Sequence, residues 1–443
     1  MKYFVLTLGC QMNMSDSERV KTVFSNMGYK QTDNEEEADI LGVMACSVRQ
    51  AAIDRVYSKI HDWNLRKDRK SIITFVSGCI LPKDMTKFEK LFDLSFPTAE
   101  MEKLPEFLNH YGVPSIHSVS PARLDPIKSE FWSIQASYDS SFDAFVPIQN
   151  GCNKFCSFCA VPYTRGREVS RPSEEILKEV GDLINKGYTS ITLLGQNVNS
   201  YGLDKKGQEL SFAELLHRIG EVGDKASHRL WIYFTSPHPR DMTNEVLDVI
   251  AAHPSIANQI HLPLQSGDDK VLIRMNRKHS MDRYRQIVEY ARHKIPNIAI
   301  TTDIIVGFSG ETDEQFANTV LAMEEFKYNM AFIAKYSPRP GAASYQWEDN
   351  VSMNDKKKRF EILTESLKKS SYAHNISMID KEIPVLIQGR SRDGKYLIGR
   401  TEGKVNVRIK SDDLSLIGKI MDVSVSRANP FSIEGEFVMV TAK

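Results

Sequence analysis

Six short apolar runs alternate with amphipathic helical patterns through the middle of the chain, and this alternation limits the possible folds more than any other feature. The apolar runs, each a predicted strand, are Phe145–Gln149, Ile191–Leu194, Leu230–Phe234, Gln259–Leu264, Ile298–Val306 and Met330–Tyr336. The predicted helices are Ser173–Lys186, Phe212–Val222, Thr243–Ala252, Met281–His293 and Thr312–Phe326. Such βα units predict a partial α/β barrel, short of the usual eight units, with its functional site at the strand carboxyl ends.

Three further apolar runs near the amino terminus each lead into a cysteine. The pairs are Tyr3–Leu8 with Cys10, Ile40–Ala45 with Cys46, and Ile72–Val76 with Cys79, and helical patterns at Ser15–Met27 and Ser47–Trp63 separate them. We expect an α/β domain with a parallel sheet over residues 1–120. Since ligands bind beyond the carboxyl ends of parallel strands, the three cysteines should meet at one sheet edge. Alternatively, each is simply a buried apolar thiol.

The carboxyl-terminal part has a different pattern. A polar stretch at Ser118–Ser141 is interpreted as a linker, the central unit as residues 138–370, and Asn354–Asn375 as a lysine-rich helical connector. Five closely spaced strand patterns then predict a small β-barrel over residues 375–443, which is a common nucleic-acid module. The strands are Ile383–Gln388, Tyr396–Arg400, Lys404–Lys410, Lys419–Ser426 and Glu434–Val440.

The composition excludes some classes of protein. Lys and Arg equal Asp and Glu, 57 against 57, so any basic surface must be local. No apolar run approaches the roughly 18 residues of a membrane helix, and no membrane partner is expected. The start, Met1–Cys10, looks like a lipoprotein signal, but its apolar stretch is shorter than the roughly 7–15 residues of a signal core. We expect a cytoplasmic chain whose six cysteines bind metal or act in catalysis.

Cys152, Cys156 and Cys159 follow the first strand of the predicted barrel with the spacing C-x-x-x-C-x-x-C. Thiolates suit iron–sulfur clusters or zinc. Since a four-iron cluster normally takes four cysteines, three in one loop would leave one iron open to a ligand. The alternative is a zinc site completed by a histidine; the candidate histidines, all far along the chain, are His217, His238 and His261.

This cysteine loop resembles that of the radical S-adenosylmethionine (SAM) superfamily. The resemblance implies that the open iron binds SAM, which one-electron reduction cleaves, and that the aromatic Phe158 lies beside the adenine. Five positions at predicted strand ends are further candidates for the cofactor site, although each also fits an ordinary strand-to-helix turn. They are Gly195, Gln196, Ser236, Gln265 and Gly307.

Longer motifs extend the resemblance over nearly the whole chain, to the methylthiotransferase family and its tRNA-modifying branch. The motifs are Leu8–Asn13, Ser15–Glu18, Cys46–Arg49, Ser77–Cys79, Cys159–Glu168, Ser170–Pro172, His261–Gly267 and Met275–Arg277. The carboxyl-terminal strands resemble the family's RNA-binding TRAM domain. The family usually has Asn-Thr where Met44-Ala45 stands and Pro where Ser309 stands, and Ile80–Pro82 is also unusual. None of these differences removes a cysteine.

The resemblance implies two 4Fe-4S clusters, one at Cys152, Cys156 and Cys159 and an auxiliary one at Cys10, Cys46 and Cys79 that carries the sulfur to be donated. The closest branch adds a methylthio group to carbon 2 of N6-(dimethylallyl)adenosine beside the tRNA anticodon. We therefore expect a tRNA anticodon stem-loop as substrate, an electron donor such as a flavodoxin or ferredoxin, and a monomer. Arg165, Arg167 and Arg171 are candidate phosphate contacts or a solvated basic loop.

Three other functions fit the same sequence. Two are sister activities, methylthiolation of threonylcarbamoyl-adenosine in tRNA and of an aspartate in a ribosomal protein. Pro162–Glu168 argues against both, because this run resembles the dimethylallyladenosine branch. The third is a non-catalytic iron–sulfur protein that binds RNA or senses redox state. The six-unit barrel argues against a sensor, which needs no cofactor cavity.

Overall fold

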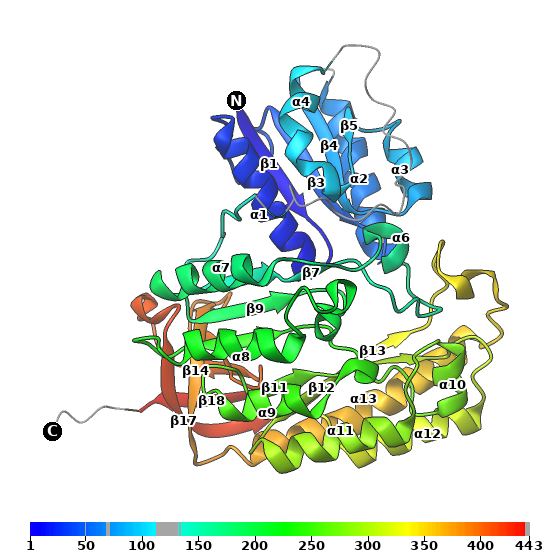
Figure 1. Cartoon of the computed structure of the whole chain (residues 1–443), viewed down its shortest axis with the longest axis vertical. Helices are drawn as coiled ribbons and strands as arrows, with labels where there is room; N and C mark the ends of the chain where they lie inside the picture. The colour runs from blue at the N-terminus through cyan, green and yellow to red at the C-terminus, as the bar shows by residue number, and fades with distance from the viewer. Residues whose placement is uncertain (49, 68–70, 112–131, 133, 439–443) are drawn as a thin grey trace.

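The computed structural model describes residues 1–48, 50–67, 71–111, 132 and 134–438. An amino-terminal α/β unit stands on one end of a partial α/β barrel, and a small closed β-barrel lies beside that barrel (Figure 1). The predicted boundary at residue 120 and most of the predicted linker Ser118–Ser141 lie outside the described residues. No helix in the described ranges is long and apolar enough to cross a membrane.

The amino-terminal unit is a five-stranded parallel sheet in the order β2-β1-β3-β4-β5. Its strands are β1 Lys2–Thr7, β2 Lys30–Gln31, β3 Ile40–Cys46, β4 Ile73–Cys79 and β5 Leu94–Ser95. Its helices are α1 Gln11–Asn26, α2 Gln50–Lys67, α3 Pro82–Phe88 and α4 Leu104–Asn109. The apolar stretch near the amino terminus that looks like a lipoprotein signal forms β1, which is paired on both sides within the sheet.

Helices cover both faces of this sheet. Val20 and Phe24 of α1 pack on one face, and Val56, Ile60 and Trp63 of α2 pack on the other. All seven residues of the central strand β3 are buried, as expected for a strand covered on both sides. The packing fixes the positions of the strand ends, where the cysteines lie.

The central unit consists of two parallel three-stranded sheets, β10-β9-β6 and β11-β12-β13, that curve into one partial barrel. Backbone bonds from Ile232 N to Ser255 O (2.8 Å) and from Ala257 N to Ile232 O (3.0 Å) join the two sheets. The strands are β6 Asp143–Pro147, β9 Ser190–Leu194, β10 Trp231–Phe234, β11 Gln259–His261, β12 Ala299–Val306 and β13 Met330–Lys335. The six-unit prediction is confirmed.

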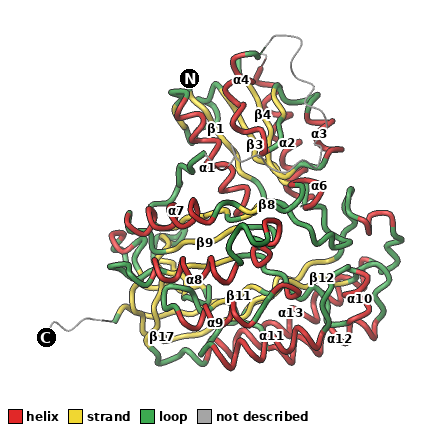
Figure 2. Tube along the Cα trace, viewed as in Figure 1, coloured by secondary structure: helices red, strands yellow, loops and turns green. Residues whose placement is uncertain are grey.

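Helices surround this barrel on the outside (Figure 2). They are α7 Ser173–Asn185, α8 Phe212–Gly223, α9 Asn244–Ala252, α10 Asp269–Arg274, α11 Met281–Lys294, α12 Asp313–Phe326 and α13 Met353–Ile376. Three short elements beside the cysteine loop were not predicted, namely β7 Gln149–Asn150, α6 Val161–Arg165 and β8 Val169–Ser170. The predicted strand Gln259–Leu264 is shorter, because Pro263 has no N–H for a ladder bond.

The predicted connector is α13, and the carboxyl-terminal barrel is closed in the order β14-β15-β16-β18-β17. Its strands are β14 Glu382–Arg390, β15 Leu397–Thr401, β16 Asn406–Ile409, β17 Ile420–Asn429 and β18 Ser432–Phe437. Two residues directly before strands of the large barrel bond to loops of the small barrel. The Thr189 hydroxyl donates to Gly418 O at 2.7 Å, and the Asn258 backbone N–H donates to the Glu402 carboxylate at 2.8 Å. The small barrel therefore covers the amino ends of the strands and leaves the carboxyl ends to the functional site.

Candidate functional site

The three amino-terminal cysteines meet at the carboxyl edge of the first sheet. Cys46 and Cys79 are the last residues of β3 and β4 and are direct partners in that ladder. Cys10 is the N-cap of α1, directly after Gly9. A Cβ added to Gly9, whose φ is +120°, would lie 2.8 Å from Cβ of Cys46. The chain turn at Cys10 thus passes against Cys46, and a glycine is needed for that approach.

Asn13 binds these chain segments together. Its amide nitrogen donates to the carbonyl oxygens of Leu8 (2.8 Å) and Ala45 (2.7 Å). Its amide oxygen accepts from Sγ of Cys79 at 3.3 Å. Burial raises the pKa of the Cys79 thiol far above its usual value, the nearby guanidinium of Arg165 opposes that shift, and the charges of Cys10 and Cys46 add to it. The three thiols therefore lie close together, with Cys46 and Cys79 buried and Cys10 exposed at the edge of the set.

The second cysteine set lies in the loop after β7, at the carboxyl ends of the barrel strands. The turn Met275–Arg277 holds this loop from the side. Ser157 N donates to Met275 O (3.0 Å), Asn276 donates to Phe155 O (2.9 Å), and Arg277 approaches Sγ of Cys156 at 3.5 Å. The loop conformation is thus set by contacts more than a hundred residues away in sequence.

Burial, together with a smaller effect of neighbouring thiol charges, raises the pKa of Cys152 and of Cys159 to about 12. Thiols in such a site remain protonated unless a cation or metal cluster binds the thiolate form. Within the described residues, Gln149 Oε1 and Asn197 Oδ1 are buried near this loop without a hydrogen-bond partner. A buried thiol set beside unsatisfied polar atoms fits a site that a cofactor completes.

Each thiolate of a four-iron cluster binds a different iron, so the thiols surround a volume and need not converge on one point. Both cysteine sets are therefore candidates for such a cluster. No three His, Cys, Asp or Glu side chains in the described parts of the chain are arranged to hold a single metal ion. Two of the three histidines considered for the zinc alternative have other partners. His217 instead contacts His253 at 2.8 Å, and His261 contacts Asp303 at 3.1 Å.

The five other positions suggested for the cofactor lie at the barrel strand ends. Gly195 and Gln196 follow β9, Ser236 lies two residues beyond β10, and Gly307 follows β12. The Gln196 side chain accepts a hydrogen bond from Gly151 N at 2.5 Å, next to the cysteine loop. Gly307 has φ +70° and donates from its backbone to Glu311 at 2.6 Å.

Gln265 and Phe158 line the same end of the barrel. The Gln265 backbone, with φ 76°, bonds to Asp303 O (2.8 Å) and to Ile305 N (2.9 Å) of β12, which extends the barrel wall. The half-buried Phe158 ring lies edge-on to Phe308, with centroids 6.5 Å apart. All these positions lie at the same end of the barrel as the loop of Cys152, but the contacts that the structure describes for them are within the protein, and their role toward SAM stays a prediction.

Arg165 connects the two cysteine sites. It is the last residue of α6, six residues after Cys159, and its Nε donates to Sγ of Cys79 at 2.7 Å. The same guanidinium donates to Asn13 (2.9 Å), to Asp16 (2.5 Å) and to Asn150 (3.0 Å). The hypothesis that Arg165 holds phosphate is wrong, because its side chain is only 1% exposed.

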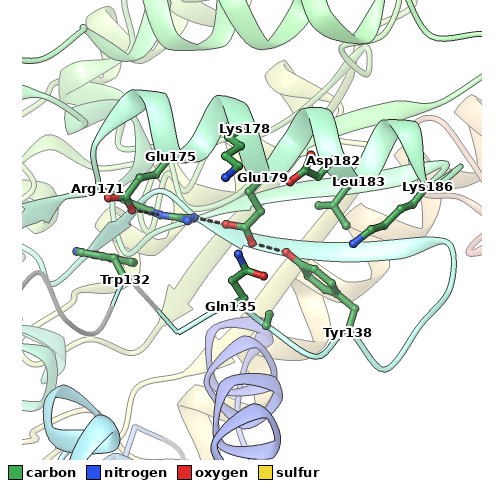
Figure 3. A pocket seen from close by; sticks show the side chains of 11 residues that line it. Trp132, Gln135, Tyr138, Arg171, Glu175, Lys178, Glu179, Asp182, Leu183 and Lys186 are labelled. Atoms are coloured by element: carbon green, nitrogen blue, oxygen red, sulfur yellow. Dashed lines mark hydrogen bonds and ion pairs between the residues drawn. The ribbon is translucent and has the colours of Figure 1, made fainter. Parts of the chain in front are cut away.

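Arg171 is also unavailable to phosphate. Figure 3 shows its guanidinium between Glu175 and Glu179 of α7, and Glu179 also accepts a hydrogen bond from Tyr138. Two carboxylates therefore neutralise the one cation. Of the three arginines, only Arg167 is exposed, and it stacks on Phe155 with its guanidinium carbon 4.5 Å from the ring centre.

Three family models match the chain in order. "Uncharacterized protein family UPF0004" matches residues 2–96, "Radical SAM superfamily" residues 146–323, and "TRAM domain" residues 377–438. Among curated proteins, a tRNA-2-methylthio-N(6)-dimethylallyladenosine synthase of Clostridium tetani is 39% identical over 98% of this chain and 96% of its own. The synthase of Aquifex aeolicus is 34% identical over 99% of both chains.

The chain belongs to this family of radical SAM methylthiotransferases. Its fold is also similar to solved radical SAM enzymes. A radical SAM methyltransferase, TsrM of Kitasatospora setae, superposes with a TM-score of 0.60 at 12% identity, over 78% of this chain and 75% of that chain. The likeness extends the shared fold beyond the barrel, because it covers more of the chain than the Radical SAM model alone.

Sequence reasoning about the methylthiotransferase missed the roles of Asn13 and Asp16. Both lie in motifs that carried the family resemblance, Leu8–Asn13 and Ser15–Glu18, but their partner Arg165 is about 150 residues away. Within the lysine-rich helix α13, the run Lys356–Arg359 is half buried. Lys356 pairs with Asp349 at 2.6 Å, and Arg359 pairs with Glu311 at 2.7 Å.

Proposed function

We propose that this methylthiotransferase converts N6-(dimethylallyl)adenosine beside the tRNA anticodon into its 2-methylthio derivative, with two 4Fe-4S clusters and SAM. Cys152, Cys156 and Cys159 would hold the SAM-binding cluster, and Cys10, Cys46 and Cys79 the auxiliary cluster. The observation that carries the proposal is that Arg165, which follows the loop of Cys152, Cys156 and Cys159, reaches Cys79 of the amino-terminal set at 2.7 Å. Two metal sites that share one buried contact can act on one substrate.

The target chemistry explains the need for two sites. The hydrogen on carbon 2 of adenine is not acidic, and no side-chain base in the ordinary pKa range removes it. When bound, SAM and the clusters would supply one-electron chemistry, a methyl group and sulfur. The protein's own part is to bury the thiols, keep water out and hold the base between the sites.

The open side of the barrel offers a place for the base. Phe332 lies on the edge strand β13, is 60% exposed and contacts the His261 ring at a centroid distance of 5.8 Å. Phe332, His261 and Asp303 alternate with the core-facing residues of their strands, so they face the barrel interior. An exposed aromatic ring can stack on a base, and the His261–Asp303 pair can bond to its edge.

The remaining partners follow from this proposal. The TRAM-type barrel, at the far end of the strands, would bind tRNA outside the anticodon loop. A flavodoxin- or ferredoxin-like protein would deliver electrons, and the enzyme would act as a monomer on cytoplasmic tRNA. The 4Fe-4S cluster at Cys152, Cys156 and Cys159 is the one that family membership implies. The auxiliary cluster rests on the thiol geometry described above.

Nucleoside mass spectrometry tests the proposal. The reconstituted enzyme, SAM, a reductant and tRNA carrying N6-(dimethylallyl)adenosine should yield the 2-methylthio nucleoside. tRNA carrying threonylcarbamoyl-adenosine is the comparison substrate. Methylthiolation of that nucleoside alone, or of a ribosomal protein alone, would overturn the proposed substrate. SAM cleavage without product on any of these substrates would overturn the proposed transfer.

A further inference from the structure

The guanidinium of Arg165 lies in an unusual position for an arginine of a cysteine loop. It donates a charge-assisted hydrogen bond to the sulfur of Cys79, which belongs to a different domain-sized unit and to the other cysteine set. Asn150 and Asn13 hold the guanidinium on its two sides, with bonds of 3.0 and 2.9 Å. These contacts leave it little freedom to turn away from the sulfur.

The surroundings make this contact electrostatically strong. The Arg165 side chain is 1% exposed and that of its partner Asp16 is 0% exposed, so little solvent screens either charge. The nearest opposite charge to Arg165 is Asp16 at 2.5 Å, and the next donor contact is the Cys79 sulfur at 2.7 Å. Arg165 therefore presents a positive charge and an N–H directly to the sulfur, while Asp16 partly offsets that charge.

We propose that Arg165 tunes the amino-terminal cluster, raising its reduction potential through the contact with Cys79, with Asp16 lowering it again. Hydrogen bonds to cluster sulfurs and nearby net charge set the reduction potentials of iron–sulfur proteins. Reduction adds one electron, and hence one negative charge, to the cluster. A fixed positive charge beside a ligand sulfur stabilises that reduced state more than the oxidised state.

The inference rests on the proposed auxiliary cluster, and it makes Arg165 a positioning residue. Besides its electrostatic effect, Arg165 also links the two cysteine sites structurally. Arg165 follows Cys159 by six residues. Its backbone carbonyl accepts from Asn150 at 3.1 Å and its guanidinium donates to the same residue at 3.0 Å, so both its backbone and its side chain are bound beside the SAM-cluster loop. A change in that loop would reach the amino-terminal cluster through this one residue.

The test uses the full-length chain in a background where Cys152, Cys156 and Cys159 are all replaced by Ala, so that one cluster remains. Its midpoint potential is measured by dithionite titration followed by electron paramagnetic resonance. In this background, Arg165→Gln should lower the ratio of reduced to oxidised cluster at a fixed potential at least ten-fold. For a one-electron couple, this corresponds to a midpoint potential about 59 mV more negative. Asp16→Asn should shift the potential in the opposite direction.

Two further variants make the result decisive. Arg165→Gln combined with Asp16→Asn removes the buried pair together, avoids an uncompensated charge, and should give a potential between those of wild type and Arg165→Gln. Arg167→Gln, the exposed neighbour, should leave the potential unchanged. An unaltered potential in both Arg165 variants with intact cluster signal, or equal shifts from Arg165→Gln and Asp16→Asn, would overturn the inference. A background protein without any cluster would overturn the auxiliary cluster itself.

Discussion

Cys46 and Cys79 are paired in the parallel ladder of β3 and β4, at the last position the two strands share. Parallel strands in register bring residues at equivalent ends side by side, so two thiols 33 positions apart in sequence become neighbours in space. Cys10 completes the set because α1 begins at the same edge. The sheet, rather than any local motif, creates this triad.

The triad can be tested by removing Cys46. Since Cys46→Ala takes away one of three proposed ligands, the iron content should fall by about half, from about eight to about four per chain, by the iron count of two four-iron clusters. SAM cleavage should persist and the methylthio product should disappear. Iron and acid-labile sulfide assays with product analysis measure this; full iron content with normal product would contradict the assignment.

Removing Cys156 should give the complementary result. The Cys156→Ala variant keeps the amino-terminal triad but loses a ligand of the SAM-binding cluster. Formation of 5′-deoxyadenosine from SAM, measured by chromatography, should be abolished, while about half of the iron stays bound. Cleavage that survived this change would show that the loop does not bind the cofactor in the proposed way.

Gly78, directly before Cys79, should not accept a side chain. Its φ is +114°, and an added Cβ would lie 2.4 Å from the Ala45 carbonyl oxygen on the neighbouring strand. Gly78→Ala should therefore push β3 and β4 apart beside the thiols and cost several kcal/mol of stability, with loss of the amino-terminal cluster. Thermal unfolding and iron analysis measure both effects.

Gly28 provides the matched control for this change. It also has a positive φ, +78°, but an added Cβ would meet nothing within 4 Å. Gly28→Ala should therefore lower the stability by only about 1 kcal/mol, because only the backbone conformation is strained, and it should leave the iron content unchanged. Equal effects of the two substitutions would show that packing at Gly78 is unimportant.

Glu18 predicts a pH dependence of stability. Burial raises its pKa from 4.5 to about 7 in the folded chain, although the hydrogen bond from the Asp139 backbone N–H opposes the shift. The folded state holds its proton more tightly than the unfolded state, so stability should fall as the pH rises from about 4.5 to about 7. Glu18→Gln removes this loss, and its free energy of unfolding at pH 8 should exceed that of wild type by up to about 3 kcal/mol.

Thermal unfolding of the apoprotein at pH 4.5 and pH 8 checks this prediction. Glutamine keeps the oxygen that accepts from Asp139 N at 3.1 Å, so the variant differs mainly in charge. A gain in the stability of Glu18→Gln that is large at pH 8 and small at pH 4.5 supports burial of the Glu18 carboxylate as the cause. A variant that is equally stabilised at both pH values, or destabilised at both, contradicts it.

Phe332 should affect substrate binding alone. If its exposed ring stacks on the target base, Phe332→Ala removes about 1–3 kcal/mol and should raise KM for tRNA roughly 5- to 150-fold. SAM cleavage in the absence of tRNA should stay unchanged. Leu321, 61% exposed on the outer helix α12, is the control position, and Leu321→Ala should leave KM as in wild type.

Much of the fold could be predicted from the sequence because its elements obey local rules. The barrel strands and their covering helices have hydrophobic periodicities that a short window reveals, as at Ala299–Val306 and Phe212–Gly223. The short pieces β7, α6 and β8 were not predicted, since two to five residues carry too little periodicity. They are stabilised by tertiary contacts around the cysteine loop.

The sequence by itself determined the two cysteine sets, the order of strands and helices, and the family. Cysteine spacing and hydrophobic periodicity are local properties that can be identified in the sequence alone. The environment of Arg165 was decided only by the tertiary structure. Its neighbours Asp16, Cys79 and Asn150 come from three distant segments, and no local pattern distinguishes a buried, paired arginine from a solvated one. Burial and pairing depend on the packing of whole units against each other, which exists only once the chain has folded.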